Sequence, residues 1–162
     1  MDNMFRFWYR FVLDNNSMIA RGAADLAYRR IKPHLSDYMG KVFEEICKQY
    51  LWKQLLAGKS PIEFSSLGRW WGNDPIQKSQ AEIDIMGQQD KDTALFAACK
   101  WTNEKVDFRV LETLIRRSRL FSYMNVHFYL FSKSGFTKDC MDKADALGNT
   151  TLVSYENIIN SD

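Results

Sequence analysis

Apolar and polar residues alternate along two stretches in the middle of the chain. Residues 81–86 and residues 95–101 both show this pattern, and the polar segment 87–92 separates them. Successive side chains of a β-strand point to opposite faces, so strict alternation is typical of a strand. The pattern therefore predicts two strands joined by a turn.

The same alternation assigns each side chain to a face. In the first strand, Ile83 and Ile85 are expected on one face, with Glu82 and Asp84 on the other. The second strand is expected to show Leu95, Ala97, Cys99 and Trp101 on one face and Phe96, Ala98 and Lys100 on the other. If the strands pair as a hairpin, Asp84 and Lys100 meet. They would form either a cross-strand ion pair or part of a metal-dependent nuclease site, which needs a carboxylate and a lysine on adjacent strands.

Helical spacing dominates the first third of the chain. The aromatic segment 4–13 and residues 18–31 are each expected to form a helix, the second ending before Pro33 because proline disfavours helix in the preceding residue. Residues 34–57 have the strongest apolar stripe. Glu44 lies at the margin of that stripe, either as a functional carboxylate or as a rim residue paired with a lysine.

The second half of the chain alternates between strand and helix patterns. Strands are expected at 62–71, 126–132 and 151–154, and helices from a cap at Thr102 or Asn103 to about Phe121 and after a cap at Thr137. The resulting order predicts an α/β fold with a mixed sheet. Arg116, Arg117 and Arg119 cluster at the end of one helix, where they either complement the helix dipole or contact phosphates.

Composition narrows the function classes. The 162 residues carry a net charge of only +2, so any nucleic-acid surface must be a local patch. The three cysteines are odd in number and far apart, which favours reduced thiols in a cytoplasmic protein. Two histidines give no zinc-ligand spacing. No apolar run approaches the length of a membrane span, and the N-terminus is unlike a signal peptide.

Several motifs together resemble one protein family. They are Phe7-Trp8-Tyr9-Arg10-Phe11, Gly40-x-x-Phe43-Glu44, Gly68-Arg69-Trp70-Trp71, Glu82-Ile83-Asp84, Cys99-Lys100-Trp101 and Phe131 to Thr137. In this order they resemble the C-terminal domain of archaeal-type DEXX-box ATPases, which is also found in bacteria. The resemblance covers nearly the whole chain.

This resemblance implies a domain organisation. Residues 1–33 would be an N-terminal aromatic helical extension, and 34–162 a nuclease-like domain. In that family an ATPase domain and a winged-helix domain come first, and both are expected partners of this domain. The chain has no Gly-x-x-x-x-Gly-Lys-Ser/Thr loop, so we expect it to be one piece of a longer protein.

The domain of that family is in turn similar to the PD-(D/E)xK nuclease superfamily. This similarity implies a restriction-endonuclease-like core, with a mixed central sheet flanked by helices, and a Mg²⁺ or Mn²⁺ site. Glu44, Asp84 and Lys100 match the superfamily pattern, and the resemblance implies that Asp84 and Glu44 hold the metal, with Glu82 beside Asp84 as the candidate for a further ligand. Ala98 stands where the pattern has a glutamate. Three accounts of Ala98 are open. The substitution was engineered, the domain lost catalysis naturally, or Glu82 or Glu112 supplies the carboxylate that is missing at position 98.

The expected function follows from this match and its one departure. We expect a metal-dependent DNA endonuclease-like domain that is inactive or impaired because of Ala98. Arg69, Arg116 and Arg117 would contact the nucleic-acid backbone. The alternative is a non-catalytic DNA-binding or interdomain module on the same fold. The residues distinguish neither DNA from RNA nor a monomer from a homo-oligomer.

Overall fold

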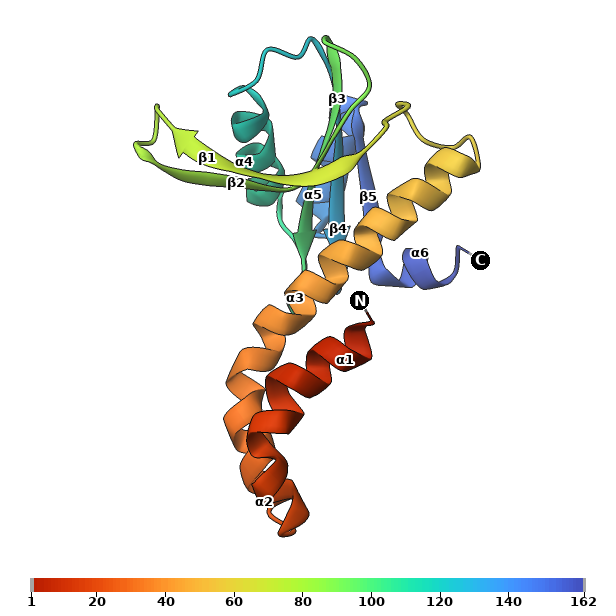
Figure 1. The fold of residues 1–162 in the computed structure, drawn as a ribbon. Coiled ribbons are helices and arrows are strands. Elements are labelled where there is room, and N and C mark those ends of the chain that lie inside the picture. Colours follow the sequence, from red (N-terminus) through yellow and green to blue (C-terminus); the bar gives the residue numbers. More distant parts are fainter. Residues whose placement is uncertain (1, 162) are drawn as a thin grey trace. The chain divides into compact units, whose positions relative to one another are not determined.

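A computed structural model describes residues 2–161 of the chain. It divides into two compact units, Met1–Val42 and Phe43–Asp162. The long helix α3 (Ala24–Leu56) runs through the boundary, so its first part belongs to one unit and its second part to the other (Figure 1).

The first unit is helical and is held together by aromatic side chains. It contains α1 (Asn3–Phe7), a π-helical turn (Trp8–Val12), a 3-10 turn (Leu13–Asn15), α2 (Asn16–Ala20) and the first part of α3. The rings of Phe7, Phe11 and Tyr38 pack with centroids 5.2 to 5.9 Å apart. The Tyr38 hydroxyl also donates a hydrogen bond of 2.7 Å to the Asn3 carbonyl. The aromatic N-terminal segment therefore packs against α3 within this unit.

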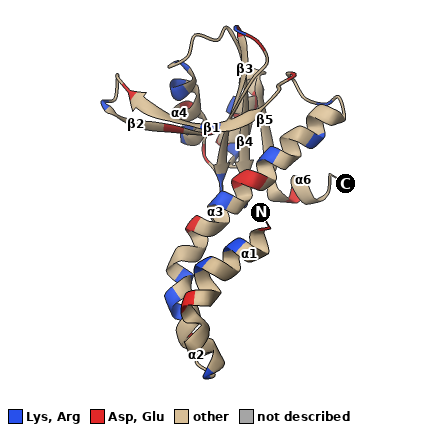
Figure 2. Cartoon of the chain, in the orientation of Figure 1, with Lys and Arg blue, Asp and Glu red and all other residues tan. Residues whose placement is uncertain are grey.

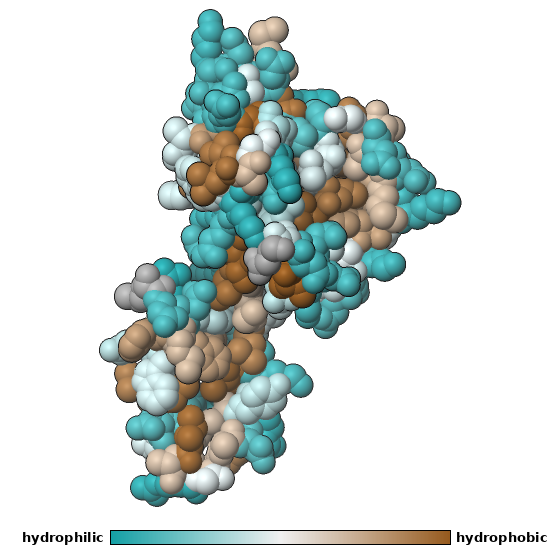
Figure 3. Space-filling view, turned by 90° about the vertical axis from the view of Figure 1, so that its right-hand side faces the viewer, coloured by the Kyte–Doolittle hydropathy of each residue, from teal (hydrophilic) through white to brown (hydrophobic). Residues whose placement is uncertain are grey.

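Large apolar side chains nevertheless remain exposed on the first unit. They are Met4, Phe5, Trp8, Tyr9, Leu13, Ile19, Leu26 and Tyr28. Brown and tan side chains gather in the lower part of Figure 3, which corresponds to this unit. Several neighbouring exposed aromatic residues are unusual on a solvated surface and are typical of a contact with another protein surface.

The expectation that a helix ends before Pro33 was wrong. α3 continues through Pro33 without a break. Proline removes one backbone hydrogen bond, the one to the carbonyl four residues earlier, but its fixed φ is compatible with a helix. Pro33 and Arg29 are both exposed, so water can solvate the released carbonyl. The two expected helices are therefore one.

The second unit contains a five-stranded mixed sheet in the order β1-β2-β3-β4-β5. Its elements after α3 are β1 (Leu67–Asp74), β2 (Ser79–Gln88), β3 (Thr93–Lys100), α4 (Phe108–Ser118), β4 (Asn125–Ser132), α5 (Lys138–Leu147), β5 (Thr150–Ser154) and α6 (Tyr155–Ile159). The first three strands pair antiparallel, and β3, β4 and β5 pair parallel. The predicted α/β class with a mixed central sheet flanked by helices is confirmed.

Helices cover both faces of this sheet. On one face, Phe43, Cys47 and Leu51 of α3 pack on Ile85, Leu95, Ala97, Tyr129 and Phe131. On the other face, Leu111 and Leu114 of α4 and Cys140 and Ala144 of α5 pack on Phe96, Ala98 and Leu130. The predicted alternation along β3 is confirmed, because its odd-numbered residues face α3 and its even-numbered residues face α4.

The helix ends depend on local capping. Thr137 caps α5 by accepting a hydrogen bond from the Cys140 N–H, as expected. The cap of α4 is Asp107, not Thr102 or Asn103, because the segment between them forms a bridge from Val106 to Phe136 instead. Consequently α4 begins later than expected.

None of the helices within residues 2–161 is both long enough and apolar enough to cross a bilayer. Lysine and arginine residues are interspersed with aspartate and glutamate along the elements (Figure 2). The expectation that basic charge is not collected into one large field agrees with this distribution.

The half-buried His127 predicts how stability depends on pH. Burial lowers its pKa below the usual range, so the neutral ring is favoured in the folded state. The unfolded state takes up a proton near its ordinary pKa of about 6.5, and the free energy of unfolding should fall as pH decreases below that value. Urea denaturation at about pH 7.5 and about pH 5.5 measures the difference.

We expect His127→Gln, which can still hydrogen-bond Thr151, to reduce this pH dependence. The control is His34→Gln, which removes the other, exposed imidazole. Equal pH dependence in the wild type and His127→Gln would contradict the prediction.

Candidate nucleic-acid interface

A β-bulge in the β1–β2 ladder positions the central carboxylate. Arg69 of β1 stands opposite two residues of β2, Asp84 and Ile85, where the register shifts. Because the extra residue interrupts the alternation, Ile83 packs toward α4 and Ile85 toward α3. The expectation that these two isoleucines share a face was wrong, since strict alternation holds only in a strand without a bulge.

Asp84 is fixed to the neighbouring strand by its own side chain. The β2–β3 ladder ends at the pair Ile85 and Ala97. Beyond this point the Asp84 carboxylate accepts a hydrogen bond of 2.8 Å from the Cys99 N–H. The carboxylate thus takes the place of a backbone acceptor where the two strands separate, and its position is set by β3 as well as by β2.

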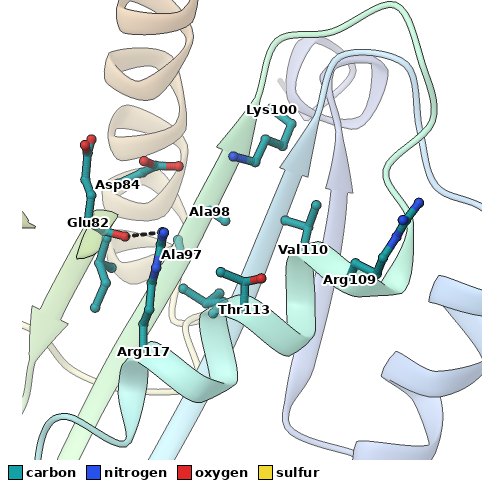
Figure 4. Close-up of a pocket in the computed structure, with 11 residues that line it drawn as sticks. Glu82, Asp84, Ala97, Ala98, Lys100, Arg109, Val110, Thr113 and Arg117 are labelled. Atoms are coloured by element: carbon teal, nitrogen blue, oxygen red, sulfur yellow. Dashed lines mark hydrogen bonds between the residues drawn. The ribbon is translucent and has the colours of Figure 1, made fainter. Parts of the chain in front are cut away.

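A cavity of about 250 Å³ lies where β2 separates from β3. Asp84, Ala98 and Lys100 line it from the strands, together with Glu82. Figure 4 shows the Lys100 amine directed toward the Asp84 carboxylate, with Ala98 on the same strand as Lys100. The structure therefore brings together the residues at three of the four positions of the nuclease pattern, with Ala98 at the position that departs from it.

Glu44, the fourth of these residues, does not line that cavity. Its carboxylate lies 3.8 Å from the Arg69 guanidinium, which also forms an ion pair with Glu82. Arg69 thus bridges a helix-borne and a strand-borne acid. In this arrangement the Arg69 guanidinium is held by two carboxylates, although the sequence suggested that it would contact phosphates.

The half-buried Cys99 lies in the electrostatic field of Asp84 and Glu44. Burial is the largest cause of its raised pKa, followed by the interactions with Cys47 and then by the charges of these two carboxylates. The Cys99 thiol is consequently protonated at neutral pH.

The arginines of α4 differ in where they point. Arg117 lines the cavity, and its Nη1 donates a hydrogen bond of 2.6 Å to the Glu82 carbonyl. Its Nε is buried without a hydrogen-bond partner. Arg109 also lines the cavity and pairs with Asp107 at 2.6 Å. Arg116 is exposed on the helix and lies outside the cavity lining.

The sequence analysis did not identify two polar residues of α4 that line the cavity, Arg109 and Thr113. Arg109, Thr113 and Arg117 are spaced four apart, so they form one row along the helix that faces the cavity. That spacing could have separated Arg117 from Arg116. It also excludes Glu112, which is exposed and not part of the lining, as a substitute for the missing carboxylate.

The side chains present do not fit a Mg²⁺ site. No group of three histidine, cysteine, aspartate or glutamate residues in the described part of the chain is arranged to hold a metal ion. Ala98 supplies a methyl group where a carboxylate would be needed, and Glu82 pairs with Arg69. Mg²⁺ is usually held by one or two carboxylates, with waters in its other positions, and the Asp84 carboxylate already accepts the Cys99 N–H.

Comparison with known proteins places these residues in a family. The model of the DUF234 family, described as archaeal and bacterial proteins of unknown function, matches residues 8–111. An uncharacterized protein of Methanocaldococcus jannaschii is 32% identical over 122 residues, which is 74% of this chain. The match covers 26% of that protein, so this chain spans about a quarter of its length.

The chain is less similar to a solved structure than to this relative. The crystal structure of a protein of unknown function matches with a TM-score of 0.42 and 16% identity, over 72% of this chain and 66% of the other. The family match covers most of the chain, including Glu44, Arg69, Asp84, Ala98 and Lys100. The chain therefore belongs to the DUF234 family of archaeal and bacterial proteins of unknown function.

Proposed function

We propose that this domain binds the phosphate backbone of DNA in the cavity between β2, β3 and α4, and that it does not hydrolyse it. The observation that carries the proposal is the Arg117 guanidinium, whose buried Nε has no hydrogen-bond partner beside a cavity that Lys100 also lines. A phosphate oxygen in the cavity would accept from the Arg117 guanidinium. Charge-assisted hydrogen bonds of this kind are among the stronger polar interactions in proteins.

The local charge supports a polyanionic ligand. Lys100, Arg109 and Arg117 line the cavity together with Asp84 and Glu82. The lining residues themselves therefore carry three positive and two negative charges. A phosphodiester could lie between Lys100 on the strand and Arg117 on the helix, while Arg109 exchanges its pairing with Asp107 for a neighbouring phosphate.

The resemblance to PD-(D/E)xK nucleases explains the acidic residues that backbone binding does not need. A carboxylate beside a phosphate is repulsive unless a cation lies between them, and Asp84 is such a carboxylate. We infer that Asp84, Glu44 and Lys100 are parts of a nuclease-type site in which Ala98 removes one metal ligand. Glu82 does not replace that ligand because Arg69 engages its carboxylate.

The family resemblance also suggests where the domain acts. We infer that it belongs to a longer cytoplasmic ATPase and that the exposed aromatic residues of the first unit contact its ATPase or winged-helix domain. The relative from M. jannaschii is much longer than this chain, which leaves room for such domains. In this setting the present domain would hold DNA while the ATPase portion acts on it.

Replacing Ala98 with glutamate should create a metal site. The Ala98→Glu variant adds a carboxylate beside Asp84, and we expect Mn²⁺ binding at least tenfold tighter than in the wild type, about 1.4 kcal/mol. Isothermal titration with Mn²⁺ measures the gain. Adding Asp84→Asn to this variant should abolish it. An Ala98→Glu protein that is folded but binds Mn²⁺ no better than the wild type would contradict the nuclease-type assignment.

The two neighbouring arginines of α4 test the phosphate site. Arg117→Ala should weaken binding of a labelled DNA about tenfold and lower the slope of log affinity against log salt by about one. Arg116→Ala removes the same charge from the exposed face of the same helix and is the matched control. Fluorescence anisotropy at several salt concentrations measures both. Equal losses in the two variants would indicate only a diffuse effect of charge.

Removing the charge of Asp84 should strengthen DNA binding in this chain. Asn at position 84 can still accept the hydrogen bond from the Cys99 N–H but no longer repels a phosphate. We expect Asp84→Asn to tighten binding by about threefold to fivefold, the size of one charge interaction in a partly solvated site. Weaker binding in this variant would show that Asp84 is itself needed to hold the ligand. The same anisotropy assay measures the DNA affinity of this variant.

A further inference from the structure

The distal half of the β1–β2 hairpin extends beyond the ladder with β3. β2 pairs with β3 only through residues 85–88, whereas it pairs with β1 from residue 79 to residue 87. Residues 70–84 therefore form a two-stranded ribbon, which Figure 1 shows extending away from the other strands. This ribbon borders the cavity of the proposed phosphate site.

The two faces of the ribbon have different environments. On one face, Trp70 packs on Phe121 with ring centroids 5.0 Å apart, and Ala81 and Ile83 are buried. The other face carries the directly opposed pairs Trp71 with Glu82 and Asn73 with Gln80. Opposed residues of an antiparallel ladder share a face, so these four side chains lie together. Trp71 is 77% exposed among them.

A second cavity, of about 350 Å³, lies along this ribbon. Its lining includes Trp71, Asn73 and Gln80. Glu82 and Arg117 line both this cavity and the first one. The two cavities are therefore neighbours, and the guanidinium with the unpartnered Nε lies between them.

We propose that this face of the ribbon is a nucleobase subsite for a single strand. The proposal rests on the phosphate site described under the proposed function. A base adjoining the phosphate held by Arg117 would stack on the Trp71 indole, an interaction open to any base because each has a π-face. Asn73 and Gln80 carry amides that can donate to and accept from base edges.

The chemistry of the surrounding residues favours this occupant over a protein surface. An apolar partner would need a contiguous apolar face, but the neighbours of Trp71 on its face are two amides and a carboxylate. A base in a duplex has both faces covered by its neighbours in the stack. The subsite is therefore specific for unpaired nucleotides, such as a single strand or an overhang.

The experiment compares two equally exposed apolar residues of the same hairpin. Trp71 and Ile76 are both 77% exposed, but Ile76 lies in the turn and outside the cavity lining. We expect Trp71→Ala to weaken binding of a labelled single strand of about 12 thymidines roughly tenfold. Trp71→Phe, which keeps a stacking ring, should lose less, and Ile76→Ala should bind like the wild type.

Blunt duplex DNA of the same length provides the second readout. Trp71→Ala should leave duplex affinity nearly unchanged, because stacking needs an unpaired base. A loss with Arg117→Ala but none with Trp71→Ala would overturn this inference and leave the phosphate site standing. Equal losses on both DNAs with Trp71→Ala would overturn it as well. If the wild type binds neither DNA, the proposed function fails together with this inference.

Discussion

The hydrogen bond from the Cys99 N–H to the Asp84 carboxylate is the interaction on which the site depends. Two antiparallel strands normally satisfy each other's backbone groups along their whole length, and a gap between them leaves donors unpaired. Here the β2–β3 ladder ends beside the bulge opposite Arg69, and a side chain supplies the acceptor that the backbone does not. The strands can therefore separate without leaving a buried donor unsatisfied. A cavity lined by polar and charged groups forms in the space that they leave.

The same gap determines what the site can do. Lys100 of β3 and a row of residues of α4 line it, so positively charged side chains from two elements surround the cavity. It also presents Ala98 at the place where a second metal ligand would be required. Asp84, Lys100 and two arginines line the cavity, and Glu82, the other carboxylate of the lining, pairs with Arg69, so the set of side chains suits a phosphate better than a metal ion. This imbalance is the physical basis for proposing binding without hydrolysis.

Local patterns predicted the composition of the site better than its geometry. The four later strands, the alternation of β3 and the cap at Thr137 follow from short-range rules that one sequence contains, whereas the first strand was expected at 62–71 and lies at Leu67–Asp74. The motifs likewise identified a family of unknown function to which the chain belongs. The bulge at Asp84 was not predictable, because it depends on pairing with β1 and leaves no local signal. The continuation of α3 through Pro33 was not predicted either, because an exposed proline costs a helix only one hydrogen bond and the sequence does not show that the residue is exposed.

The ion-pair partners of charged residues could not be predicted from the hydrophobic and polar pattern either. Glu44 and Arg69 were each assigned a separate role, but residues 25 positions apart form an ion pair only when tertiary structure brings them together. Conversely, the four-residue spacing of Arg109, Thr113 and Arg117 was available in the sequence and would have distinguished Arg117 from Arg116.

The adjacency of the two cavities along the hairpin would give the domain a sense of direction. Each phosphodiester joins two nucleosides, one through its 3′ oxygen and one through its 5′ oxygen, so a base lies on either side of a given phosphate. If Arg117 grips the phosphate and Trp71 receives a base, the two orientations of the strand would present bases that are linked to that phosphate through different atoms and at different reach. A domain built in this way would bind the two orientations with unequal affinity without reading any sequence.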